Sequence, residues 1–360
     1  MNKNKQNSFF VFLISLIELN LNLSKMKHVF LVKGFTILAF TFLIVGVSSC
    51  KSSEEKKDDS VTQEESVQTD ADMPFFKLSL AQWSFNKHIR SGEMSPLDFA
   101  QKASELGFEG IEYVSQLYRN ELKKDPDPKV AMQILLKTLK EKSETYNVRN
   151  VLIMVDGEGD LGTQDIAKRQ EAIENHKKWV DAAKYLGCHS IRVNAKGEGT
   201  AEEVATAAVD GLGKLADYAE KQGINVLVEN HGGYSSNGQW LADVMKRIGK
   251  SNCGTLPDFG NFCLTVGYGS INDENCAEAY DIYKGIAELM PYAKAVSAKS
   301  YDFDENGNQP TMDYVKILQI VKNAGYTGFI GVEYEGNNLE EEEGTIATLK
   351  LLLNSAKQLK

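Results

Sequence analysis

The sequence predicts a (β/α)8 barrel over residues 76–360, and three observations support this fold class. Eight short apolar runs each precede a stretch with helical spacing, as repeated strand–helix units require. A helix end, a glycine and a β-rich run recur in that order, and a polar residue ends nearly every run. An open doubly wound sheet is the alternative, but no GxGxxG motif follows the first run.

Segments rich in β-branched residues alternate with helical stretches throughout this region. Ser95 and Pro96 indicate a helix start, because serine caps helices well and proline suits the first helical position. Gly107 indicates a helix end, because glycine readily adopts the left-handed conformation there. The last helix is predicted to bury a face made of Ile346, Leu349, Leu352, Leu353 and Ala356. The expected strands are 78–83, 110–113, 148–155, 190–194, 225–229, 254–258, 293–299 and 328–333.

The N-terminal segment is predicted to lie outside the barrel. Gly34–Val47 is an apolar stretch that suits a signal peptide and is shorter than the ~20 residues of a membrane-spanning helix. The residues before Cys50 resemble a lipobox, which predicts a leader over 1–50 and a lipid-modified Cys50; an uncleaved signal anchor is the alternative. A second apolar stretch precedes Met26, so we expect translation to start at Met26. Residues 51–75 form an acidic and polar tether, and the predicted location is a membrane-anchored lipoprotein facing the periplasm or cell surface.

Charge and cysteine content restrict the partners. The net charge is −10, so nucleic acid is not an expected partner, because phosphates need basic surfaces. The predicted barrel contains four cysteines without any CxxC pair, which argues against a zinc knuckle. Outside the cytoplasm they could form disulfides, and buried free thiols are the alternative. These cysteines are Cys188, Cys253, Cys263 and Cys276.

Three acidic residues end strands that are distant in sequence. Glu229, Asp258 and Glu333 are expected to converge, because the carboxyl ends of barrel strands meet on one face. Their charges repel unless shared protons or a hard divalent cation such as Mg²⁺ or Mn²⁺ offset them. Asp258 could instead cap a turn, and Glu335, on the same face as Glu333, could exchange roles with it.

Other polar residues at strand ends suit substrate binding. Arg192 and Asn194 share one face and could recognise hydroxyls or an acidic group, or form a structural ion pair. His231 follows Glu229 by two residues and could bind substrate, transfer a proton or support its loop. Lys299 ends the seventh strand and could bind a substrate oxygen or lower the pKa of an acid.

Two further residues complete this predicted ring of side chains. Glu112 is expected at the end of the second strand, and Trp83 at the end of the first. A tryptophan ring offers a platform for the face of a sugar, although packing in the core is the alternative.

Five segments together resemble the sugar phosphate isomerase/epimerase superfamily. These xylose isomerase-like TIM barrels include the AP endonuclease 2 family, and the resemblance covers residues 77–358. Each segment is weak alone, but the set is fairly specific for the superfamily. The segments are Ala81–Phe85, Gly107–Glu112, Val228–Gly233, Pro257–Asn261 and Gly331–Gly336.

The resemblance implies a divalent metal site for Mn²⁺, Mg²⁺, Co²⁺ or Zn²⁺. In that family two glutamates, an aspartate and a histidine bind the metal, and Glu229, Asp258 and Glu333 match the three carboxylates. Ser297 stands where the family usually has its histidine, and Asn261 where several epimerases have another. These departures imply a weaker site, one completed by Ser297 or water, or a lost site. The nucleic-acid-repair branch is disfavoured, since its zinc cluster needs several histidines.

The predicted function is a metal-dependent sugar isomerase or epimerase. It would move a proton at the carbon beside a carbonyl through an enediolate, with Glu229 or Glu333 as the base. The other glutamate, Lys299 or His231 would return the proton. A non-phosphorylated sugar is expected outside the cytoplasm. The alternatives are a keto-glycoside lyase using the same site and a non-catalytic carbohydrate-binding barrel, and relatives often form homodimers.

Overall fold

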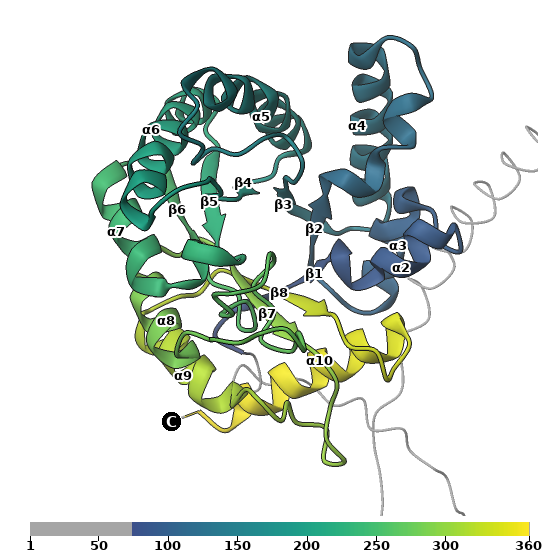
Figure 1. The fold of residues 1–360 in the computed structure, drawn as a ribbon. Coiled ribbons are helices and arrows are strands. Elements are labelled where there is room, and N and C mark those ends of the chain that lie inside the picture. Colours follow the sequence, from purple (N-terminus) through teal and green to yellow (C-terminus); the bar gives the residue numbers. More distant parts are fainter. Residues whose placement is uncertain (1–73, 360) are drawn as a thin grey trace, which may run out of the picture. The chain divides into compact units, whose positions relative to one another are not determined.

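The computed structural model describes residues 74–359 and confirms the predicted (β/α)8 barrel (Figure 1). All neighbouring strands are parallel, in the order β6-β5-β4-β3-β2-β1-β8-β7. The predicted leader, Cys50 and all but the last two residues of the predicted tether lie outside the described residues. The strands are β1 (Lys77–Ala81), β2 (Gly110–Val114), β3 (Arg149–Met154), β4 (Ser190–Val193), β5 (Asn225–Glu229), β6 (Cys253–Leu256), β7 (Val296–Ser300) and β8 (Phe329–Tyr334).

The ring closes between β6 and β7 through irregular backbone. Two isolated parallel bridges join Thr255 to Ala293 and Asp258 to Ser297. The Ser297 amide also donates to the Pro257 carbonyl at 2.9 Å. Asp258 and Ser297 therefore face each other across this seam, at the carboxyl end of the barrel.

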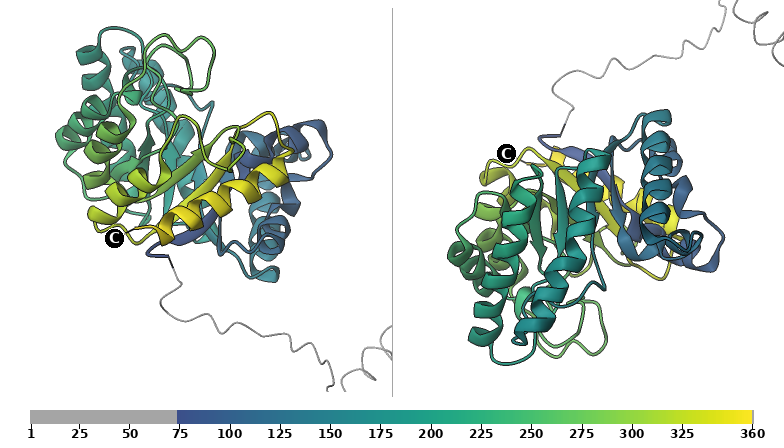
Figure 2. Two further views of the ribbon diagram at one scale, coloured as in Figure 1. Left: turned by 90° about the horizontal axis from the view of Figure 1, so that it is seen from below. Right: turned by 90° about the horizontal axis from the view of Figure 1, so that it is seen from above.

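The helices lie on the outside of the strands, and α10 runs along one side of the barrel (Figure 2). Local sequence sets their ends as predicted: the Ser95 side chain accepts from the Leu97 amide, and Gly107 has φ +81°. No helix among residues 74–359 combines the length and apolar character needed to cross a bilayer. The α-helices are α2 (Asn86–Ser91), α3 (Phe99–Glu105), α4 (Pro128–Thr145), α5 (Ile166–Leu186), α6 (Ala201–Glu220), α7 (Gly238–Ile248), α8 (Ile282–Leu289), α9 (Tyr314–Asn323) and α10 (Glu341–Lys357).

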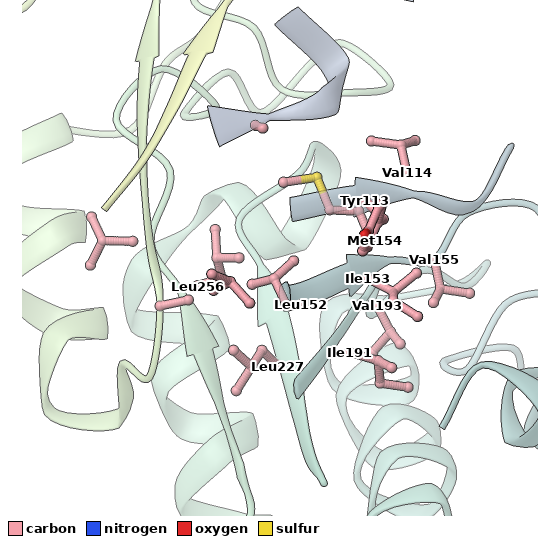
Figure 3. Packing of buried hydrophobic residues seen from close by; sticks show 14 of the residues in the cluster. Tyr113, Val114, Leu152, Ile153, Met154, Val155, Ile191, Val193, Leu227 and Leu256 are labelled. Carbon is pink, nitrogen blue, oxygen red and sulfur yellow. The ribbon is translucent and has the colours of Figure 1, made fainter. Parts of the chain in front are cut away.

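Alternation along the strands divides the apolar core into two layers. Leu152, Leu227 and Leu256 cluster inside the ring, whereas Ile153 and Ile191 belong to the layer beneath the helices (Figure 3). All five side chains are buried. Closer to the carboxyl ends of β5, β6 and β8, the inward positions are acidic.

The buried face of α10 differs from the prediction. Small and polar residues form most of it, and of the expected residues only Leu352 is fully buried. Gly344 packs on the Tyr334 ring, because a Cβ there would lie 2.1 Å from a ring carbon. The helix thus lies too close to β8 for large side chains to fit between them, which a count of leucines does not reveal. The buried residues are Glu341, Gly344, Thr345, Thr348, Leu351, Leu352 and Ser355.

Candidate active site

Three acidic side chains meet at the carboxyl end of the barrel. Glu229 is the last residue of β5, Asp258 follows β6 by two residues, and Glu333 lies near the end of β8. One carboxylate oxygen from each lies within 4.8 Å of the other two, and all three side chains are buried. The structure thus brings together the acids that the sequence placed at the ends of distant strands.

Ser297 lies between two of these acids. Its Oγ is 2.7 Å from Oδ2 of Asp258 and 3.0 Å from Oε2 of Glu333. A hydroxyl has one proton and can donate only one of these hydrogen bonds at a time. The second contact becomes a hydrogen bond when one carboxyl group is protonated. Burial favours that state by raising the pKa of Glu333 to about 7 and that of Asp258 well above its usual value.

Two buried cations neutralise the cluster in part. The Nζ of Lys299 lies 3.4 Å from Glu333, 3.3 Å from Glu335 and 3.8 Å from Asp258. Burial alone would lower the pKa of Lys299, but these carboxylates raise it, so the ammonium stays charged. The Nε of Arg192 lies 2.8 Å from Oε2 of Glu229.

A polar chain extends from Arg192 across the site. Arg192 Nη1 donates to Oδ1 of Asp156 at 2.9 Å, and the Asn194 amide donates to the same oxygen at 2.7 Å. The Asn194 side-chain oxygen lies 2.8 Å from Nδ1 of His231. Burial and Arg192 lower the pKa of His231 to about 3, so its ring is neutral near pH 7.

Asp156 is a site residue that the sequence analysis missed. It follows β3 directly after Val155, and a strand-end acid in that position is the same signal that identified Glu229. Burial opposes its ionisation, but Arg192 and other neighbours lower the pKa of Asp156 below its usual value. Asp156 is therefore an ionised carboxylate that orients Arg192.

Glu112 occupies a different place from the predicted strand end. It lies in the middle of β2, where the pairing with β3 shifts register, and its side chain is fully buried. Ser79 donates to Oε1 at 2.6 Å, and Oε2 has no hydrogen bond. The side chain lies over Gly331, where a Cβ would be 2.6 Å from Oε1. Burial raises the pKa of Glu112 to about 8, so it is a neutral acid inside the barrel rather than part of the cavity wall.

A cavity of about 460 Å³ opens above the acid cluster. Asn261 lines it and donates to Oε1 of Glu229 at 3.0 Å. Trp83 lies on its wall, but the guanidinium of Arg90 covers one face of the ring at 4.6 Å, leaving less room for a sugar there. The predicted residues that line the cavity are Trp83, Arg192, His231, Asn261, Lys299, Glu333 and Glu335.

A disulfide closes the loop that forms one wall of this cavity. Cys263 and Cys276 are bonded, and Tyr268, Ser270 and Asp273 lie between them and line the cavity. The Tyr268 ring lies 5.3 Å from the His231 ring. The other two cysteines of the described chain, Cys188 and Cys253, are buried free thiols, so both alternatives for the cysteines occur.

The acid cluster has the donors that a hard divalent cation requires. Oε2 of Glu229 is buried and close to Arg192, but the N–H points away from it, so this oxygen accepts no aligned hydrogen bond. Carboxylate oxygens and the Ser297 hydroxyl make an oxygen-only set, which suits ions such as Mg²⁺ and Mn²⁺. The residues present therefore fit a metal, although Lys299 competes for two of the carboxylates.

Comparison with known proteins identifies the family. The model of the family described as "Xylose isomerase-like TIM barrel" matches residues 100–355, well over half of the chain. The chain belongs to this family. The resemblance of the sequence to this family is therefore confirmed.

Similar proteins include enzymes that act on sugars. A C-glycoside deglycosidase alpha subunit from Arthrobacter globiformis is 44% identical over 50 residues, which span only 14% of each chain. The structure resembles 3-keto-D-glucoside 4-epimerase from E. coli, with TM-score 0.56 and 14% identity over 78% of this chain and 99% of the other. It also resembles the zinc-bound IOLI protein, with TM-score 0.59 and 16% identity over 79% and 99%. The two structural similarities establish the fold alone.

Proposed function

We propose that this protein is a metal-dependent isomerase or epimerase of a non-phosphorylated sugar or sugar derivative. The reaction would transfer a proton at the carbon beside a carbonyl group, through an enediolate. The observation that carries the proposal is an excess of acid: five carboxylates, three of them buried, face two cations, Arg192 and Lys299. A divalent cation would offset that excess, whereas binding a neutral sugar would not require it. The acids are Asp156, Glu229, Asp258, Glu333 and Glu335.

Glu229, Asp258 and Glu333 would hold the metal, with the Ser297 hydroxyl beside them. When bound, the metal would polarise the carbonyl and hydroxyl oxygens of the substrate and stabilise negative charge on them. Because ligands must be deprotonated and burial raises the pKa values of these acids, binding would release protons.

The other steps of the reaction are assigned to side chains by their position and charge. Glu333 lines the cavity, so it would accept the proton from the substrate and return it. Glu229 lies against Arg192 and can serve as the second proton-transfer group on another element of the barrel. Lys299 keeps its proton, so it would stabilise an enediolate oxygen rather than act as the acid. Neutral His231 would bind a hydroxyl.

A keto-glycoside lyase is the second candidate. Its support is the local identity to the Arthrobacter globiformis deglycosidase alpha subunit, together with the 3-keto-glucoside epimerase among the similar structures. The same α-proton would leave, and the electrons would expel a β-leaving group instead of recapturing a proton. The two reactions differ only in the fate of the enediolate, so one site could support either.

The cavity loop supports the proposed location outside the cytoplasm. A disulfide such as Cys263–Cys276 persists in oxidising compartments and is rare in the cytosol. We therefore propose that the protein is a lipoprotein anchored through Cys50. Labelling of the protein with a lipid precursor, and its loss in Cys50→Ala, tests this proposal.

Solvent isotope exchange tests the proposed chemistry. The purified protein would be incubated with Mn²⁺ in D₂O with methyl 3-keto-β-D-glucoside or D-fructose. We expect deuterium at the carbon beside the carbonyl, and release of methanol if the lyase reaction operates. Glu229→Gln should abolish both exchange and stoichiometric Mn²⁺ binding, while Lys137→Met, at an exposed site, should change neither.

The outcomes separate the three functions. Exchange with a rearranged sugar supports the isomerase or epimerase, and exchange with methanol release supports the lyase. Sugar binding without exchange or metal binding would refute both and favour the carbohydrate-binding barrel.

A further inference from the structure

The cavity gathers an unusual share of the chain's arginines. The chain has six arginines, and three of them line this one cavity: Arg90, Arg119 and Arg192. Arg192 is buried and paired with Glu229 and Asp156. Arg90 and Arg119 are exposed, so they belong to the mouth of the cavity, whereas Arg192 belongs to its floor.

The two arginines at the mouth lack carboxylate partners. Within residues 74–359, no carboxylate oxygen lies within 4.0 Å of either guanidinium, although Asp156, Asp273 and Glu335 line the same cavity. Their N–H donors are therefore available to a ligand that enters the cavity, although the chain as a whole has a net charge of −10.

Packing keeps both guanidinium groups near the cavity. Arg90 lies over the Trp83 ring at 4.6 Å, an arrangement that cation–π attraction favours. Arg119 lies against Gly157, where a Cβ would be 2.8 Å from Nη2. Arg90 lies on α2, Arg119 directly follows the 3₁₀ turn Ser115–Tyr118 (η4), and these two elements contact each other. A side chain at position 157 would push Arg119 away, so the glycine permits this close approach.

We propose that Arg90 and Arg119 bind an anionic substituent of the substrate, with a carboxylate such as that of a uronic acid as the expected group. The planar guanidinium fork matches a carboxylate through two parallel hydrogen bonds. The acids on the floor would repel an anion placed among them, so the negative group must sit at the mouth while the reacting carbons face Glu333. This inference rests on the proposed function, because it names the substrate class for the same site.

Binding measurements test the inference without requiring turnover. Calorimetry on the purified protein would compare the methyl glycosides of glucuronic and galacturonic acid with methyl glucoside and methyl galactoside. We expect at least one uronide to bind about tenfold more tightly than its neutral partner, and about 500 mM salt to weaken only the uronide. Arg90→Gln and Arg119→Gln should each weaken uronide binding by about three- to tenfold and leave neutral sugars within about twofold.

Arg149 provides a matched control. It is an exposed arginine without a carboxylate partner within 4.0 Å in the described chain, and it starts β3 at the opposite end of the barrel. Arg149→Gln should leave both affinities unchanged. Methyl glycosides that carry a sulfate at position 6 identify which anionic group the site prefers. If the sulfated sugars bind more tightly than the uronides, and the Arg90 and Arg119 variants lose this binding, the anion site is supported with a sulfate ester as its ligand.

Two results would overturn the inference. One is the absence of any preference for an anionic sugar, including no detectable binding of any of them. The other is an equal loss in Arg149→Gln and Arg90→Gln. If anionic sugars are not preferred but deuterium exchange occurs, the proposed function stands and only the anion site is refuted. If anionic sugars bind but no exchange occurs, only the proposed chemistry is refuted.

Discussion

Lys299→Met would remove the ammonium that three carboxylates share. The side chain is 3% exposed, and its Nζ lies 3.3–3.8 Å from Glu335, Glu333 and Asp258. Methionine has a similar length and no charge, so the packing stays close to native while the acids lose their shared cation. The variant therefore isolates the electrostatic role of Lys299.

The distances give the size of the effect. At an effective dielectric constant of about 20, unit charges about 3.4 Å apart attract by about 5 kcal/mol. The acids can take up protons when the cation is gone, so the net cost is smaller than the sum of three such attractions. Removing one partner of a buried ion pair costs about 3–5 kcal/mol, which lowers the Tm of a domain of this size by about 5–8 °C.

Calorimetric unfolding in EDTA, with and without excess Mn²⁺, measures this effect. We expect Mn²⁺ to raise the Tm of Lys299→Met more than that of the parent, because the metal no longer competes with the ammonium. Lys137→Met is the control: Lys137 is 70% exposed and 3.8 Å from Glu141, so its loss should cost less than about 1 kcal/mol. Equal Tm losses in the two variants would refute the charge-sharing argument.

Two further predictions concern the cavity loop and the barrel interior. Replacing Cys263 and Cys276 with alanine should lower the unfolding free energy by about 2–3 kcal/mol, because the disulfide closes a loop of 13 residues. Mass spectrometry without reductant that finds both thiols free would contradict the bond. The raised pKa of Glu112, about 8 against 4.5 unfolded, means that its contribution to stability is present below about pH 4.5 and lost as the pH rises toward 8. The Glu112→Gln variant cannot ionise at this position. Denaturant titrations should therefore show that the unfolding free energy of the variant, relative to that of the parent, increases between about pH 5 and pH 8. Parallel pH profiles for the two proteins would argue against a protonated Glu112.

The periodicity of the sequence was sufficient to predict the fold. Strand–helix alternation and glycine helix stops predicted all eight strands within a few residues, because these patterns depend on local backbone preferences. The buried face of α10 was predicted less well. A helix that packs closely on a strand buries small residues such as Gly344, and leucine spacing does not report that distance.

By itself, the sequence determined that Glu229, Asp258 and Glu333 lie at the ends of parallel strands, and hence on one face of a barrel. Only the tertiary structure decided which charges meet there: Asp156 with Arg192, and Lys299 with three acids. It also decided that Glu112 is buried below the cavity and that the loop from Cys263 to Cys276 forms its wall. The physical reason is that a side chain's face follows from alternation along its own strand, whereas its partners and its pKa depend on the register and burial set by all eight strands together.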